Sequence, residues 1–103
     1  MDTESCTLLT ILTEAKLEQA LTDDVERLGA RGWTVTDARG KGEWGEREAD
    51  WASSGNIRLE VVCAPSVAEQ IAEHVTATYG GDHPLVLYLS DVRVPTHGPS
   101  RAR

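Results

Sequence analysis

Hydrophobic positions in the first third of the chain predict a strand, a helix and a second strand. Thr7–Leu12 is a short apolar run of the kind that forms a buried strand. Apolar residues then recur at helical spacing as far as Gly29, a residue type that commonly ends helices. These apolar residues are Leu17, Leu21, Val25 and Leu28. Residues 33–36 alternate again after Gly32, so this half predicts the order β-α-β.

The second half repeats the plan. Apolar and polar residues alternate from Ile57 to Cys63, which predicts a strand, and Pro65 then suits the first turn of a helix. The inner stripe of this helix is Val67, Ile71, Val75 and either Thr78 or Tyr79. Gly80 and Gly81 end the helix, and a last strand runs over residues 85–94 until Pro95 stops it.

Two tandem β-α-β units with right-handed crossovers predict an α+β, ferredoxin-like β-α-β-β-α-β fold with both helices on one sheet face. The strands carry apolar residues in both registers, for example Leu8 beside Leu9, so the second face also needs a cover. With no further helix to supply it, we expect a homo-oligomer. We expect residues 1–95 to form a single domain and residues 96–103 a short, flexible tail.

Composition excludes several classes of function. A formal net charge of -7 and the absence of a basic, aromatic stripe argue against nucleic-acid binding. The apolar runs have the length of strands and the first residues are acidic, so we expect a cytoplasmic protein without membrane insertion. Cys6 and Cys63 form no CxxC motif and are expected to be buried thiols.

Residues 39–55 form a connector between the two halves that is too long for a simple hairpin, and loops of this length are usually functional or disordered. Basic residues near its start accompany two glycines whose backbone N–H groups can approach a ligand. The basic residues are Arg39, Lys41 and Arg47, and the glycines are Gly40 and Gly42. The pattern fits a phosphate cradle or a plain turn, and it lacks P-loop spacing. The acidic distal part is suited to contact a partner protein.

No catalytic arrangement is evident in the sequence. His74 belongs to the second predicted helix, His83 to a turn and His97 to the tail, and none has the spacing of a metal or nucleophile motif. The adjacent carboxylates Asp23 and Asp24 are expected to be exposed to solvent on their helix. We therefore expect a protein that is not an enzyme and needs no metal.

Two short segments resemble a known family. Gly32-Trp33-Thr34-Val35 and Arg39-Gly40-Lys41-Gly42 resemble the G-x-T-V…G-x-G stretch that opens the T-loop of PII signalling proteins. The order of elements over residues 7–94 follows the same family. The Gly-Lys-Gly version and the short length are most similar to the PII-like branch linked to bicarbonate transport, which includes SbtB and carboxysome-associated proteins.

The resemblance implies a homotrimer that binds adenine nucleotides in clefts between subunits. The implied contacts to adenine and ribose are Gly32, Trp33 and Thr34. The implied contacts to phosphate are Gly40, Lys41 and Gly42, and Arg39 beside them belongs to the same expected nucleotide site. Arg47 is our candidate for a second phosphate contact. The position of the family's B-loop is occupied by the turn at His83, Pro84 and Leu85. Glu43 replaces a family arginine and the B-loop lysine is missing, so charge favours AMP, ADP or cyclic AMP over ATP.

The expected function is therefore sensing rather than catalysis. An adenine nucleotide, with or without bicarbonate, would order residues 40–55 and change the surface offered to a bicarbonate transporter or a carboxysome-related protein. The alternative is a CutA-like trimer that binds a metal or acts as a stress protein. Slow nucleotide hydrolysis at the same cleft is a third possibility, for which the sequence shows no general base.

Overall fold

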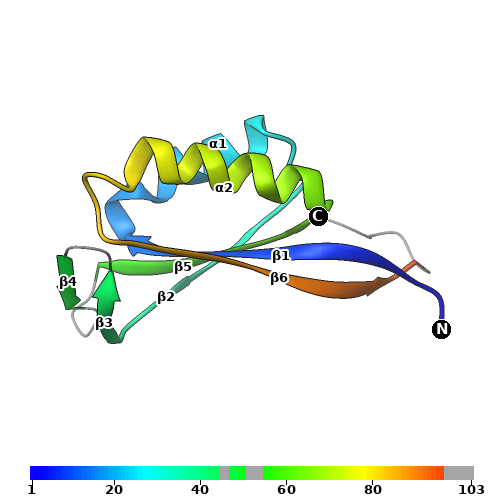
Figure 1. Ribbon diagram of the computed structural model, residues 1–103, viewed down its shortest axis with the longest axis horizontal. Helices are drawn as coiled ribbons and strands as arrows, with labels where there is room; N and C mark the ends of the chain where they lie inside the picture. Colours follow the sequence, from blue (N-terminus) through cyan, green and yellow to red (C-terminus); the bar gives the residue numbers. More distant parts are fainter. Residues whose placement is uncertain (45–46, 51–54, 97–103) are drawn as a thin grey trace.

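The computed structural model describes residues 1–44, 47–50 and 55–96, with residues 41–44 and 47–50 as backbone only. Its strands fall into three groups along the chain, separated by the helical segments (Figure 1). In order they are β1 (Thr3–Glu14), the 3-10 helix η1 (Ala15–Leu17), α1 (Glu18–Arg27), β2 (Thr34–Asp37), β3 (Lys41–Trp44), β4 (Arg47–Asp50), β5 (Asn56–Cys63), α2 (Pro65–Tyr79) and β6 (Leu85–Pro95).

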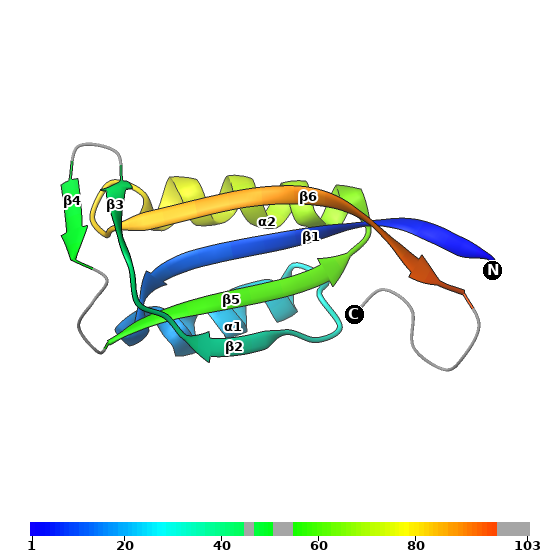
Figure 2. The same cartoon turned by 90° about the horizontal axis from the view of Figure 1, so that it is seen from below.

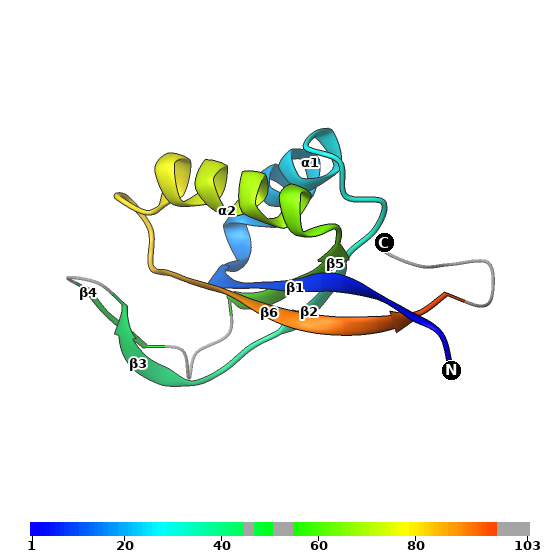
Figure 3. The ribbon, with the colours of Figure 1, turned by 45° about the vertical axis from the view of Figure 1, so that its right-hand side comes forward.

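The main body has two layers. A four-stranded antiparallel sheet has the strand order β2-β5-β1-β6. Helices α1 and α2 lie side by side over one face of it, and none of the described residues forms a helix on the opposite face (Figures 1 and 3). This arrangement confirms the predicted α+β, ferredoxin-like fold. Strand β1 extends beyond the predicted Thr7–Leu12 because its polar ends also pair with β6, from Thr3 opposite Pro95 to Thr13 opposite Leu85.

The two faces of β1 serve different purposes. Leu9 and Ile11 point toward the helices and are fully buried in the core with Leu59 and Val61 of β5. Because side chains alternate along a strand, Leu8 and Leu12 lie on the opposite face. Both are only partly buried. The predicted apolar character of both sheet faces is therefore present in the structure.

Helix α1 ends at the predicted glycine. Gly29 has φ of 114°, which L-residues rarely adopt. The Gly29 N–H donates to the Glu26 carbonyl at 3.1 Å, and the Ala30 N–H donates to the Val25 carbonyl at 2.9 Å. These two bonds form a Schellman motif, which satisfies carbonyls at the helix end. The chain can then turn back toward β2.

Helix α2 begins at Pro65, as predicted, and its inner face buries Ala68, Ile71 and Val75. The sequence left Thr78 or Tyr79 as the last member of this stripe. Tyr79 packs against the core, whereas Thr78 is exposed.

The connector contains secondary structure that the sequence did not predict. Strands β3 and β4 pair as a two-stranded antiparallel ribbon, with Lys41 opposite Asp50 and Trp44 opposite Arg47. The ribbon stands beyond the end of the main sheet where β1 ends and β6 begins (Figures 1 and 2). Residues 45–46 and 51–54 of the connector and residues 97–103 of the predicted tail lie outside the described residues.

Both cysteines are free and buried, as predicted. Burial raises the pKa of the Cys6 thiol, and the nearby Glu4 carboxylate raises it further. Burial also raises the pKa of the Cys63 thiol, with a smaller contribution from Cys6. Two thiols kept in the neutral form are poor nucleophiles.

Candidate ligand-binding cleft

A cleft of about 330 Å³ opens at the base of the connector. It is lined by Leu12, Asp37, Ala38, Arg39, Arg58 and Tyr88. Its volume lies at the lower end of the range of small-molecule sites. Two guanidinium groups against one carboxylate give the described lining an excess of positive charge, which suits an anionic ligand.

The floor of the cleft comes from three adjacent strands. Leu12 pairs with Arg58 of β5 and with Val86 of β6, and Tyr88 of β6 pairs with Thr10. Residues directly opposite each other share a sheet face, so Leu12, Arg58 and Tyr88 lie on the face opposite the helices. The cleft therefore belongs to the sheet face that lacks a helical cover.

Arg58 is a cleft residue that the sequence analysis missed. Its side chain is half exposed, and its Nε lies 3.9 Å from Glu60 Oε2. An exposed ion pair of this length is weak and leaves the guanidinium available to a stronger acceptor. Alternation over residues 57–63 already assigned Arg58 to the polar register, but only the strand pairing places it beside Leu12.

The predicted phosphate contacts divide between the cleft and the ribbon. Arg39 lines the cleft, and exposed Gly40 follows it. Lys41 and Gly42 have extended backbone at the start of β3 rather than forming a glycine-rich loop. Arg47 lies opposite Trp44, at the other end of the ribbon from Lys41, about 10 Å along the strand. Within one chain, Arg47 is therefore not brought to the base of the connector.

The turn that contains His83 and Pro84 lies at the same end of the main sheet as the cleft. His83 Nδ1 lies 3.0 Å from Glu14 Oε1, and Thr13 Oγ1 donates to the Pro84 carbonyl at 2.8 Å. Leu85 opens β6 opposite Thr13 and packs against the core, so its side chain is occupied by packing.

Gly32, Trp33 and Thr34 lie away from these residues. Thr34 begins β2 opposite Glu60, whereas the cleft begins at Asp37, about 10 Å further along the strand. Trp33 packs against the core. The structure of one chain thus leaves the predicted adenine contacts apart from Arg39.

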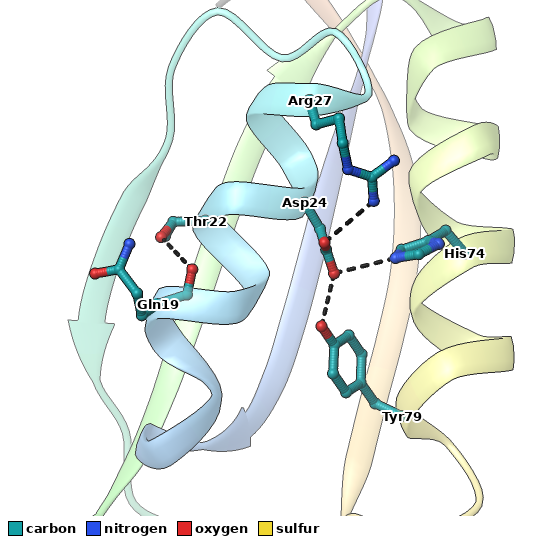
Figure 4. Close-up of polar contacts among 6 residues, drawn as sticks. All are labelled: Gln19, Thr22, Asp24, Arg27, His74 and Tyr79. Atoms are coloured by element: carbon teal, nitrogen blue, oxygen red, sulfur yellow. Dashed lines mark hydrogen bonds and ion pairs between the residues drawn. The ribbon is translucent and has the colours of Figure 1, made fainter.

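A polar cluster between the helices was also missed. Figure 4 shows Asp24 of α1 pointing toward α2. Asp24 Oδ2 accepts a 2.6 Å hydrogen bond from Tyr79 and lies 3.0 Å from His74 Nε2, and Arg27 reaches Oδ1 at 3.2 Å. The predicted exposure of Asp24 is wrong, since its side chain is only 17% exposed, although its neighbour Asp23 is exposed as expected.

These contacts shift two pKa values. Partial burial alone would raise the pKa of Asp24, but hydrogen bonds from Tyr79, Arg27 and His74 outweigh burial and lower it. Burial, together with the Asp24 carboxylate, raises the pKa of Tyr79 to about 12. The cluster lies in the helix layer, away from the cleft, and joins the two helices.

Among the described residues, no group of three or more His, Cys, Asp or Glu side chains is placed to hold a metal ion. In the same part of the chain, no helix is both long and apolar enough to cross a membrane.

Comparison with known proteins defines the class. The sequence pattern of the family "Nitrogen regulatory protein P-II" matches residues 6–98. A PII-like signalling protein from Thermus thermophilus is 39% identical, with 91% of this chain and 93% of that chain covered and a TM-score of 0.76. The molecule is therefore a PII-like regulatory protein, and the chain belongs to the nitrogen regulatory protein P-II family.

More distant structures share the fold. CPII from Thiomonas intermedia K12, solved with ADP, AMP and acetate, is 17% identical, with 92% of this chain and 93% of that chain covered and a TM-score of 0.77. A second CPII structure contains ADP and bicarbonate. CutA1 from Oryza sativa is 14% identical, with 90% of this chain and 84% of that chain covered and a TM-score of 0.58.

Proposed function

We propose that this protein binds an adenine nucleotide with few phosphates, AMP or ADP, in the cleft at the base of the connector. The proposal rests on one observation, that Arg39 and Arg58 line the same cleft of about 330 Å³. Two guanidiniums can hold a phosphate through charge-assisted, bidentate hydrogen bonds. Asp37 limits the positive charge, which disfavours a third phosphate.

The complete site requires a second copy of the chain. Leu8, Leu12 and Val62 lie on the sheet face without helices and are only partly buried in one chain. A homotrimer would cover this face and would bring Gly32, Trp33 and Thr34 of one subunit toward Arg39 of the next. Burying apolar side chains in the interface drives such an assembly. A Leu8→Glu variant should sediment as a smaller species than the wild type.

Ligand binding changes the conformation of the connector. Arg39 and Gly40 link the cleft to β3, so a ligand held by Arg39 acts directly on the base of the β3–β4 ribbon. A ligand shifts the ribbon between states only by binding one state more tightly than the other. The ribbon then presents its distal part to a cytoplasmic partner, for which we propose a bicarbonate transporter or a carboxysome-related protein.

Bicarbonate is the second ligand of the proposal. Its planar anion matches the donor geometry of an arginine side chain. The cleft offers two arginines, so a nucleotide phosphate and bicarbonate can be held together. The CPII structure that contains ADP and bicarbonate supports this pairing of ligands for a protein of the same fold.

Calorimetric titration with AMP, ADP, ATP and cyclic AMP, each with and without bicarbonate, tests the proposal. Arg58→Ala should weaken AMP or ADP binding about tenfold or more, the loss of one good charge-assisted contact. Arg93→Ala removes the same charge from an exposed position at the other end of β6 and should leave affinity unchanged. Wild-type protein that binds none of these nucleotides would refute the proposed function.

A further inference from the structure

A second cavity lies at the other end of the main sheet from the candidate cleft. Its volume is about 290 Å³, and it is lined by Ser5, Cys6, Pro65, Asp91, Val92 and Arg93. Strand β1 begins, β6 ends and α2 starts at this end, away from the β3–β4 ribbon (Figure 1). A volume just under the usual range of drug-sized ligand sites suits a small metabolite.

The charged side chains of this cavity lie on the helix-bearing face of the sheet. Asp91 and Arg93 follow Leu89 along β6 at intervals of two residues, and Leu89 pairs with the core residue Leu9. Because residues two apart on a strand share a face, both charged side chains are on the side of the helices. Pro65, the first residue of α2, also lines the cavity. The cavity and the candidate cleft therefore open on opposite faces of the sheet.

The two charged side chains of the cavity are unpaired. Neither Asp91 nor Arg93 forms a hydrogen bond or an ion pair through its side chain with another described residue. The same two-residue spacing on β5 does allow a contact, since Arg58 Nε lies 3.9 Å from Glu60 Oε2. Asp91 and Arg93 thus present opposite charges to one cavity without an ion pair between them.

Opposite charges beside one cavity favour a ligand that carries both. An anion next to Arg93 would be repelled by Asp91, and a cation next to Asp91 would be repelled by Arg93. A zwitterion satisfies both side chains, because its carboxylate accepts hydrogen bonds from the guanidinium and its ammonium group donates to the carboxylate of Asp91. The start of α2 adds a partial positive charge, which favours the ligand carboxylate near Pro65.

We propose that this cavity binds a small α-amino acid, with Arg93 on the α-carboxylate and Asp91 on the α-ammonium group. Ser5 adds a hydroxyl that can donate or accept a hydrogen bond, and Pro65 adds apolar surface for a short side chain. The site is separate from the nucleotide cleft, so the inference does not depend on the proposed function.

Titration of the isotope-labelled protein with L-alanine and L-serine, followed by NMR of the backbone amides, tests the proposal. The shifts should saturate and should centre on the ends of β1 and β6 and the start of α2. Propionate lacks the ammonium group and alaninamide lacks the carboxylate. Each analogue should bind at least about tenfold more weakly than L-alanine, because it loses one charge-assisted contact.

Variants of the two charged residues test the assignment of roles. Arg93→Gln and Asp91→Asn should each weaken L-alanine binding about tenfold or more and leave ADP affinity unchanged. Arg58→Ala changes the other site and is the reciprocal control, which should keep wild-type binding of L-alanine. Asp91 and Arg93 are exposed, so thermal melting of both variants should resemble that of the wild type.

The outcomes are distinguishable. Wild-type protein that shows no saturable shifts with L-alanine or L-serine would overturn the inference and leave the proposed function intact. Unchanged L-alanine affinity in both Arg93→Gln and Asp91→Asn would overturn it as well. Propionate that binds as tightly as L-alanine would show a plain anion site and would contradict the role of Asp91. Wild-type protein that binds L-alanine but no nucleotide would refute the proposed function alone.

Discussion

Two histidine–carboxylate pairs of equal length have different surroundings. His74 lies 3.0 Å from Asp24, and His83 lies 3.0 Å from Glu14. The first pair joins two helices and belongs to a cluster that includes Tyr79 and Arg27. The second pair joins the end of β1 to the turn before β6, at the same end of the main sheet as the candidate cleft. We therefore expect the same chemical contact to stabilise the fold in one place and to orient a proposed ligand-binding group in another.

The two carboxylates differ in exposure, since the Asp24 side chain is 17% exposed and the Glu14 side chain 31%. The Asp24 carboxylate contacts three side chains at once, so its removal leaves several polar groups unpaired in a partly buried position. Glu14 orients a ring at the end of β1, where solvent can replace some of what is lost. We therefore expect the helix cluster to control stability and the turn pair to control binding.

The largest effect is expected from Asp24→Ala. This change leaves the Tyr79 hydroxyl and the His74 ring without their acceptor and should lower the free energy of unfolding by about 2 kcal/mol. Urea denaturation monitored by circular dichroism measures it. Asp23→Ala, at the exposed neighbouring position, should cost less than about 0.5 kcal/mol. Similar losses for the two variants would contradict the role of the cluster.

Tyr79→Phe should cost about 1 kcal/mol, because only the hydroxyl that donates to Asp24 is removed. The folded-state pKa of about 12 exceeds the ordinary value of 10. The stability that it contributes is therefore complete below about pH 10 and is lost as pH rises toward 12. Wild-type stability should fall across this window more steeply than that of Tyr79→Phe in alkaline denaturation curves. Parallel curves would show that ionisation of the Tyr79 hydroxyl does not contribute to the pH dependence of stability.

Thr13→Val should cost about 1 kcal/mol and weaken nucleotide binding, because it releases the Pro84 carbonyl and loosens the turn. Thr22→Val is the matched control. Its hydroxyl also donates to a carbonyl, that of Gln19 within α1, and such local bonds add little to helix stability. Denaturation and calorimetry of both variants provide the comparison. Unchanged ADP affinity in Thr13→Val would show that the turn does not contribute to nucleotide binding.

Arg27→Ala should have the smallest effect. Its side chain is 58% exposed, so its 3.2 Å contact with Asp24 is screened by solvent and should contribute less than about 0.5 kcal/mol. Added salt should reduce this difference further. A loss as large as that of Asp24→Ala would mean that Arg27, rather than the α2 side chains, holds the cluster together.

The helices and the strands of the main sheet could be predicted from the sequence, because burial of one face imposes a regular spacing on the apolar residues. Leu21 and Val25 recur at helical spacing, and Leu59 and Val61 alternate, since each set packs against one core. The β3–β4 ribbon has no such signal, since its pairing uses backbone groups without an apolar face in the sequence. The remaining clue was Gly45-Glu46, a two-residue spacer that starts with glycine.

The cleft and the helix cluster depend on contacts between residues far apart in the sequence. Asp24 meets residues 50 and 55 positions away, and nothing in its local sequence distinguishes it from Asp23. Arg58 joins the cleft only through the register that places it beside Leu12. Arg39 was predicted, because a basic residue next to glycines can be recognised locally.

The buried thiols have a practical consequence for observing the connector. Cys6 and Cys63 are 2% and 3% exposed, and their raised pKa values keep them protonated near neutral pH. Maleimide dyes react with exposed thiolates, so the native protein should resist labelling. A single cysteine introduced on the exposed part of the connector would then carry the only fluorophore. Its emission could follow ligand-driven movement in real time without replacing either native cysteine.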